Sequence, residues 1–407
     1  MLIKYTILLG ALVVPSLSVA SEEPGGSDVP ALNSRLTELL DEVKGLQQRV
    51  EELEEEKQNK TKETEVQPVV KKEKPPLKFK GDFRLRHDTI SKDNQDEDRT
   101  RYRIRARAAV QAKVSDSAQV VFGLASGNDD PISTNQTLGD AASTKDWRLD
   151  LAYFDWQLAD QLRWVGGKYK NTLFRPGGHF LLWDGDLRPE GLSLVSKNKT
   201  WFAELGYNFV ESDNRSGKQE TVEYYTTQLG SVLQLGGTQL TTGVGYYFFN
   251  TKNKGEFDTG HLFGNSLTED GRYKYNYEEL ELFAEWKTQL ANVPFMLFAD
   301  YVQNLDAPEE DTGYALGMRW GKNKEPGDFR FSYSYQELQA DAAFGLFTDS
   351  DFAGGGTDNH GHLIKGSYVV HPGVTLALSY YDTHYGEFTL GEENRFARTF
   401  IDLIFKF

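Results

Sequence analysis

The sequence RTRYRIRARAAV occupies residues 99–110, and it says more about the fold than any other stretch of the chain. Arginine stands at every second position, at Arg101, Arg103, Arg105 and Arg107. The residues between them are Tyr102, Ile104, Ala106 and Ala108, so a β-strand here would carry guanidinium groups on one face and apolar groups on the other. Each arginine turned toward lipid near the bilayer midplane would cost about 2–4 kcal/mol. The pattern therefore favours a strand whose apolar face meets lipid and whose arginines meet water.

The same two-residue period recurs throughout residues 77–407, although soluble sandwiches also alternate in this way. Strand length separates the two classes, because a tilted strand needs about ten residues to cross a bilayer and soluble strands average about half that. Long and short connections also alternate, as in transmembrane barrels. We expect sixteen strands, at about 77–88, 99–114, 118–127, 147–159, 161–170, 190–197, 200–210, 221–235, 238–250, 275–290, 294–304, 312–322, 327–341, 360–370, 374–385 and 395–407.

The sequence thus predicts an all-β fold, a sixteen-stranded antiparallel transmembrane β-barrel preceded by a short α-helical coiled coil. Tyrosine, tryptophan and phenylalanine recur near strand ends, where barrels carry interfacial girdles that contact the lipid of the outer membrane. The chain closes on a strand ending in Phe407, which resembles the signal read by the barrel assembly machinery. An even strand number puts both ends of the barrel on the periplasmic side.

The composition excludes several classes of protein. The chain has 407 residues, no cysteine and a formal net charge of −16. Without cysteine there are no disulfides, iron–sulfur clusters or thiol nucleophiles, and the acidic balance gives no reason to expect nucleic acid as a partner. A positive residue, an apolar run and a small-residue cleavage site predict a signal peptide at 1–20, followed by a flexible N-terminus at 21–30.

A heptad repeat follows the signal peptide and predicts a coiled coil over 31–57. Val at position a with Leu at d favours two strands, whereas the local pattern RVEELE at 49–54 resembles a trimer-specifying motif, so both states stay open. A Lys/Glu-rich linker at 58–76 then leads to the barrel domain at 77–407. We expect the coiled coil to lie in the periplasm, with peptidoglycan as a candidate ligand. The oligomerisation residues are Leu32, Leu36, Leu39, Val43, Leu46, Val50 and Leu53.

Several segments of the first half of the barrel domain resemble the putative porin family of Gram-negative outer membranes, which is related in architecture to the phosphate-selective porins. These segments are DDPISTNQTL at 129–138, LDLAYFDW at 149–156, FRPGG at 174–178, WDGDLRPEG at 183–191 and the opening strand GDFRLR at 81–86. The resemblance covers 77 to about 195, and beyond that only the spacing of the strands and the terminal Phe407 match the family. It implies a sixteen-stranded, trimeric, water-filled pore with an N-terminal coiled coil, and it names no substrate.

Three groups of residues are the candidates for lining the pore and setting its selectivity. The first is an arginine ladder on the first two strands, and the second is a glycine-rich loop at 171–189 whose apolar residues favour folding into the lumen. The third is an acidic set on the tenth strand, expected on the opposite wall. The alternative for the arginines is that lumen carboxylates such as Asp82, Asp150, Asp184 and Asp186 neutralise them, so that they only stiffen the wall. The candidates are Arg84, Arg86, Arg101, Arg103, Arg105, Arg107, Arg175, Asp184, Asp186, Arg188, Glu279, Glu281 and Glu285.

No catalytic constellation is visible in the sequence, so we expect no enzyme activity, no cofactor and no metal. Of the seven histidines, only His360 and His362 approach metal-ligand spacing, and they stand in a glycine-rich segment interpreted as a solvated loop tip. The sequence predicts an outer-membrane porin that passes small hydrophilic solutes and ions by passive diffusion. The alternative is a structural anchor or periplasm-spanning tether with a plugged or weakly conducting barrel.

Overall fold

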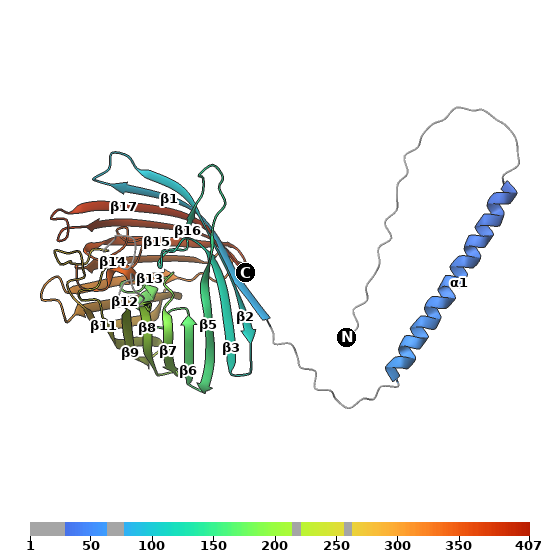
Figure 1. Cartoon of the computed structure of the whole chain (residues 1–407), viewed down its shortest axis with the longest axis horizontal. Helices are drawn as coiled ribbons and strands as arrows, with labels where there is room; N and C mark the ends of the chain where they lie inside the picture. The colour runs from blue at the N-terminus through green and yellow to red at the C-terminus, as the bar shows by residue number, and fades with distance from the viewer. Residues whose placement is uncertain (1–28, 63–76, 214–220, 256–262) are drawn as a thin grey trace. The chain divides into compact units, whose positions relative to one another are not determined.

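The computed structural model describes residues 29–62, 77–213, 221–255 and 263–407 (Figure 1). The predicted signal peptide at 1–20 lies outside these residues. Helix α1 (Val29–Lys62) contains the whole segment predicted as coiled coil. It also includes two residues predicted as flexible and five predicted as linker, because Pro30 is tolerated in a first helical turn and three of the five linker residues are Gln or Lys, which are good helix formers. No helix among the described residues is long and apolar enough to span a membrane.

The described part of the apolar stripe of α1 is exposed. Of the seven predicted oligomerisation residues, Val43, Leu46, Val50 and Leu53 have described side chains, and each is at least half exposed. The side chains of Leu32, Leu36 and Leu39 lie outside the described set. The helix and the barrel belong to separate compact units of the chain. The pairing of helices therefore stays a prediction.

The barrel unit is a closed antiparallel barrel of sixteen long strands within the described residues, which confirms the predicted fold class (Figure 1). The first strand pairs with both the second and the last, so the sheet has no free edge. The long strands are β1 (Leu77–Lys92), β2 (Arg99–Lys113), β3 (Ala118–Ser126), β5 (Trp147–Ala159), β6 (Leu162–Lys168), β7 (Glu190–Lys197), β8 (Trp201–Glu211), β9 (Val222–Leu235), β10 (Thr238–Phe249), β11 (Tyr277–Leu290), β12 (Val293–Asn304), β13 (Thr312–Gly321), β14 (Phe329–Leu338), β15 (Asn359–His371), β16 (Val374–Tyr385) and β17 (Asn394–Lys406).

One short strand was not expected from the sequence. Strand β4 (Gln136–Thr137) pairs with β2 next to Arg103, beyond the point where β3 has ended. It belongs to the long connection at 127–146, called loop 2 here. The addition occupies hydrogen-bonding groups of β2 that β3 does not reach.

The outer surface of the barrel is apolar. Large side chains on the outward faces are about half exposed, among them Leu205, Leu229, Leu282 and Leu316. An apolar belt of this kind is unfavourable in water and is the surface that a transmembrane barrel presents to lipid. At the seam, the outward Phe83 and Leu85 of β1 stand opposite Phe405 and Leu403 of β17.

The interior is filled by two long connections. The segment 169–189 between β6 and β7, called loop 3, contains a short 3₁₀ turn η1 (Pro176–Gly178). The segment 339–358 between β14 and β15, called loop 7, contains η2 (Gly345–Phe347). Apolar residues of both loops form one buried cluster with inward-facing residues of strands β9 to β14. The open part of the lumen is therefore displaced toward the remaining wall, where β1, β2 and β17 lie.

Candidate functional site

The six ladder arginines lie on the inward face of β1 and β2. Arg84 and Arg86 are buried, whereas the outward Phe83 and Leu85, which alternate with them along β1, are exposed. On β2 the register places Arg105 opposite Arg84 and Arg103 opposite Arg86. The two-residue period thus gathers the six guanidinium groups on one strip of wall, as the sequence predicts.

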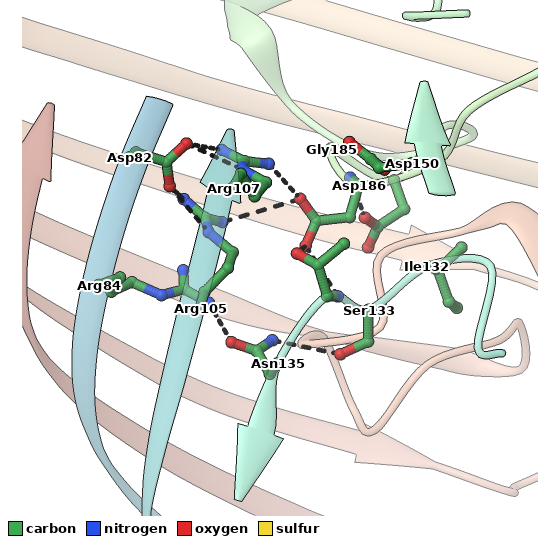
Figure 2. Close-up of polar contacts among 12 residues, drawn as sticks. Asp82, Arg84, Arg105, Arg107, Ile132, Ser133, Asn135, Asp150, Gly185 and Asp186 are labelled. Carbon is green, nitrogen blue, oxygen red and sulfur yellow. Dashed lines mark hydrogen bonds and ion pairs between the residues drawn. The ribbon is translucent and has the colours of Figure 1, made fainter. Parts of the chain in front are cut away.

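Two carboxylates neutralise the part of the strip around Arg105 and Arg107. Asp82 of β1 accepts from Arg105 at 2.9 Å and from Arg107 at 2.8 Å (Figure 2). Asp186 of loop 3 pairs with the same two arginines, at 2.9 Å from Arg107 and 3.7 Å from Arg105. Loop 3 is thereby attached to the ladder, and Thr134 of loop 2 donates to the other oxygen of Asp186 at 2.9 Å. This is the neutralised arrangement that the sequence left as an alternative.

The part of the strip around Arg86 and Arg101 belongs to a second ion-pair network, which was not expected from the sequence. Arg86 binds Asp402 of β17 at 2.8 Å and Asp351 of loop 7 at 3.2 Å. Arg398 of β17 binds Asp351 at 3.1 Å and Asp88 at 3.0 Å, and Asp88 also accepts from Arg101 at 2.6 Å. Alternating parity on the last strand would have placed Arg398 and Asp402 inward, because Ile401 and Leu403 face lipid.

Arg103 differs from its neighbours. Within the described ranges no ion pair involves its guanidinium, and its Nε is buried without a hydrogen-bond partner. Arg84 is intermediate, since it contacts Asn135 of loop 2 and lies 3.9 Å from Asp402, while its Nε also lacks a partner (Figure 2). Positive charge on the strip is therefore concentrated at Arg103 and, to a lesser degree, at Arg84.

Loop 3 packs on the opposite wall through its apolar residues. Trp183 is 2% exposed and lies within 5.0 Å of the ring of Tyr247 and 6.3 Å of that of Phe347, centroid to centroid. Burying a side chain of this size stabilises the docked loop by about 5 kcal/mol. Turn η1 contacts β11, β12 and β13, and a side chain at Gly177, whose φ is +65°, would collide with Phe298. Only glycine fits that contact without strain.

The charged residues of loop 3 mostly hold the loop together. Arg175 donates to the carbonyl oxygens of Trp183 and Asp184, at 3.1 and 3.3 Å. Arg188 pairs with Asp150 at 3.2 Å. Asp184 accepts from the backbone N–H of Ser350 in loop 7 at 3.0 Å, so loops 3 and 7 are joined directly.

Burial and ion pairing shift the pKa values of the acidic side chains in loops 3 and 7 in opposite directions. Burial raises the pKa of Asp184 well above its usual range, and the nearby Asp349 and Asp186 add to the shift. Burial also raises the pKa of Asp349 to about 6, with Asp351 adding to it. For Asp351 itself burial is outweighed by Arg398, Arg86 and Arg84, which hold its pKa well below the usual range. The carboxyl groups at the loop contact therefore resist ionisation, whereas those facing arginines are charged.

The three glutamates of β11 face inward but lie beneath the loops. Glu285 accepts from the N–H of Gly177 at 2.8 Å, and Glu279 accepts from the N–H of Phe344 in loop 7 at 2.7 Å. Glu281 accepts from the hydroxyl of Tyr247 at 2.6 Å. All three are at most 3% exposed. The sequence predicts that they form an acidic wall opposite the arginines, but in the structure Glu279 and Glu285 hold backbone groups of the infolded loops, and Glu281 binds the wall residue Tyr247.

Loop 7 was also misjudged from the sequence. The sequence predicts that the glycine-rich segment 353–362 is a solvated loop tip, but Ala353, Thr357 and Asp358 are buried and strand β15 begins at Asn359. Phe344, Leu346 and Phe347 belong to the same apolar cluster as Trp183. These three residues carry the signal that marked loop 3, namely apolar side chains inside a glycine-rich connection.

Two open cavities of about 500 Å³ each follow the arginine strip. The cavity at the short-turn end is lined by six basic side chains, Lys80, Arg107, Lys170, Arg175, Arg188 and Lys406, and by two acidic ones, Asp82 and Asp150. The cavity at the long-loop end is lined by five basic side chains, Lys92, Arg99, Arg101, Arg103 and Arg398, and by three acidic ones, Asp129, Asp130 and Asp351. Arg84 and Arg105 lie between the two. Both cavities are basic in a chain whose net charge is −16.

A closed barrel with a lipid-facing belt, polar inner wall and infolded loops defines the class of outer-membrane channels. A family model described as "Putative porin" matches residues 45–275 and 256–389. The chain belongs to this family, which confirms the resemblance found in the sequence. It is an outer-membrane porin, and both family and fold point to a channel and not to an enzyme.

Two solved structures illustrate what the chain is similar to, and the first of them supports the fold. The high-pH structure of Pseudomonas putida OprB is 13% identical, covers 81% of this chain and 94% of its own, and gives a TM-score of 0.55. The in-vitro folded trimer form of Vibrio cholerae OmpT is also 13% identical, covers 82% of this chain and 99% of its own, and gives 0.47. No curated protein matches the sequence.

The family segments recognised in the sequence meet at the site. Thr134 of loop 2 binds Asp186 of loop 3. Within loop 3, Gly177 binds β11, Asp186 binds β2 and Arg188 binds β5. The motif residues are thus the ones that fix the loops to the wall.

Proposed function

We propose that this porin conducts small hydrophilic solutes and ions along the arginine strip, with a preference for anions. The observation that carries the proposal is the pair of basic cavities on the same wall, one at each end of the strip. A confined passage with low-dielectric walls focuses the field of its charges, and arginine-lined pores favour anions. The charge of Arg103, which has no ion-pair partner in the part of the chain that the structure describes, contributes more to this field than the paired charges of Arg105 and Arg107.

Loop 3 acts in this proposal as the element that narrows the lumen. Its apolar side fills the part of the barrel next to β9–β14, and its Asp186 holds it to the ladder. Loop 7 supports it from behind through Ser350 and Phe347, since Phe347 accepts from the N–H of Asp184 at 2.8 Å. The constriction is then formed by Arg84, Arg105, Asn135 and Asp186.

The assembly proposed is a homotrimer exported by a signal peptide at 1–20, with its coiled coil in the periplasm. The exposed stripe of α1 supports this, because apolar residues at heptad spacing are buried only when other helices meet them. The OmpT structure is titled a trimer form, which is in keeping with this state. Recognition of Phe407 by the barrel assembly machinery, and peptidoglycan binding by the stalk, belong to the same proposal.

The test is single-channel recording in planar bilayers with the full mature chain. Stepwise conductance of uniform size supports a diffusion porin. The competing function is the tether, which the large apolar cluster inside the barrel favours, since it fills much of the lumen. Insertion without conductance, shown by protease protection of a barrel that passes no current, would support the tether and refute the porin proposal.

A further inference from the structure

A pair of histidines meets on the outer face of the barrel at its long-loop end. His360 of β15 and His384 of β16 are register partners, and their rings stack 5.2 Å apart with 22° between planes. His360 shares the outward face with Ile364, whereas the adjacent Leu363 is buried in the interior. Residues directly opposed in antiparallel strands have Cβ atoms about 4.5–5.5 Å apart, a spacing that lets two imidazoles approach one ion.

The third strand in this region brings a carboxylate to the same point. Glu393 directly precedes β17, whose first residue Asn394 pairs with Tyr385 next to His384. Its Oε1 lies 3.2 Å from Nε2 of His360. One donor atom from each of His360, His384 and Glu393 lies within 4.8 Å of the other two. Two adjacent strands and the residue that precedes the third thus present three potential metal ligands together.

The chemistry of this donor set selects a class of ion. Imidazole nitrogen suits Zn²⁺, Ni²⁺ and Cu²⁺, whereas Mg²⁺ and Ca²⁺ prefer oxygen ligands alone. Zinc–ligand bonds of about 2.0–2.2 Å put neighbouring donors about 3.3 Å apart in a tetrahedral site. His360 and Glu393 already have this spacing, and the partly exposed side chain of His384 needs only a rotation to join them. The exposed fourth position is left to water.

The local charge also favours a cation. A neighbouring pocket of about 290 Å³ is lined by His360 and Glu393 together with the acidic Glu310, Glu337, Asp358 and Glu387. Arg395, which stands opposite His384 on β17, is paired with Asp382 at 2.9 Å. The nearest guanidinium on that strand is therefore already neutralised, and the field at the site is negative.

We propose that His360, His384 and Glu393 form a binding site for one borderline divalent transition-metal ion, with Zn²⁺ as its probe. The bound ion fastens β15, β16 and the start of β17 at the long-loop end of the barrel. In the sequence His360 and His362 approach metal-ligand spacing, but the sheet brings His384, and not His362, beside His360. The site lies on the outer face and is independent of the conduction proposed for the lumen.

Zinc binding by the untagged, folded full chain in detergent tests the proposal, measured by isothermal titration calorimetry with Mg²⁺ in excess. We expect one Zn²⁺ per chain, and at least a tenfold weaker affinity in His384→Asn and in Glu393→Gln. His371→Asn is the matched control, because His371 is an exposed histidine at the other end of β15. It should bind Zn²⁺ as the wild type does.

A spectroscopic readout identifies the ligands themselves. With Cu²⁺ in place of Zn²⁺, electron paramagnetic resonance should show hyperfine coupling to two imidazole nitrogens in the wild type and to one in His384→Asn. The proposal is overturned if the wild type binds no Zn²⁺ above the Mg²⁺ background, or if His384→Asn and Glu393→Gln bind like the wild type. Glu393 lies outside the strands, so its variant keeps the test valid even where a strand substitution impairs folding.

Discussion

Neutralising Arg103 should reduce anion preference without weakening the barrel. In a medium of effective dielectric constant about 20, one charge about 7 Å from a passing ion contributes about 2.4 kcal/mol. Screening over a Debye length of about 8 Å leaves about 1 kcal/mol, or about a fivefold effect on the passage of a univalent ion. We therefore expect Arg103→Gln to lower the chloride-to-potassium permeability ratio at least about fivefold. The assay is the reversal potential under a KCl gradient in a planar bilayer.

Comparison with Arg105 separates a free charge from a paired one. Arg105→Gln leaves Asp82 and Asp186 paired with Arg107 alone, and the lost hydrogen bond to a charged group destabilises the barrel by about 1.5–3 kcal/mol. Arg103→Gln leaves no carboxylate unpaired, so the temperature at which the barrel unfolds in detergent should be unchanged or higher. Arg272→Gln, at an exposed arginine between β10 and β11, is the matched control. If Arg103→Gln shifts the reversal potential no more than Arg272→Gln does, the charge of Arg103 does not set the anion preference.

Three further predictions concern the loops and the stalk. Gly177→Ala should undock loop 3, because the new methyl group collides with Phe298 at a positive φ, and single-channel conductance should rise while insertion is retained; unchanged conductance would mean the loop does not narrow the pore. Deleting 31–57 should convert the oligomer to monomers or weaken it in mild detergent, as seen by native electrophoresis, and an oligomer of unchanged stability would show that barrel contacts suffice. Because the pKa of Asp349 is raised to about 6, its buried carboxyl is neutral at pH 5 and ionised at pH 7.5, so loop 7 should be docked more firmly at the lower pH. Hydrogen exchange over loop 7 checks this, and Asp349→Asn should abolish the difference between the two pH values.

The strands were predictable because the two faces of each see different solvents. The alternation on β2 fixed which side of the wall holds Arg103, and the observed bounds of β5, β7 and β16 agree with those expected. Strand β4 was not predictable, because two residues are too few to show a period. Its position depends on where β3 stops, which the sequence does not reveal.

The partners of the ladder were less predictable than the ladder itself. Asp351 is held by Arg86 and Arg398, which lie at opposite ends of the barrel sequence and become neighbours only when β1 pairs with β17. Periodicity gives the face of a residue but not the loop that will cover it. For the same reason Glu279 could be assigned to the inner wall, but not to the backbone of loop 7.

The proposed conducting path follows the strip on β1, β2 and β17 and not the filled side of the barrel. Because the chain has no cysteine, single-cysteine variants report on one position each. Ala109 of β2 lines the cavity at the short-turn end, and Ala315 of β13 lies fully buried in the apolar cluster. A negatively charged methanethiosulfonate reagent should alter the single-channel current through Ala109→Cys and leave that through Ala315→Cys unchanged. If modification alters the current through Ala315→Cys but not through Ala109→Cys, the conducting path does not follow the strip on β1, β2 and β17.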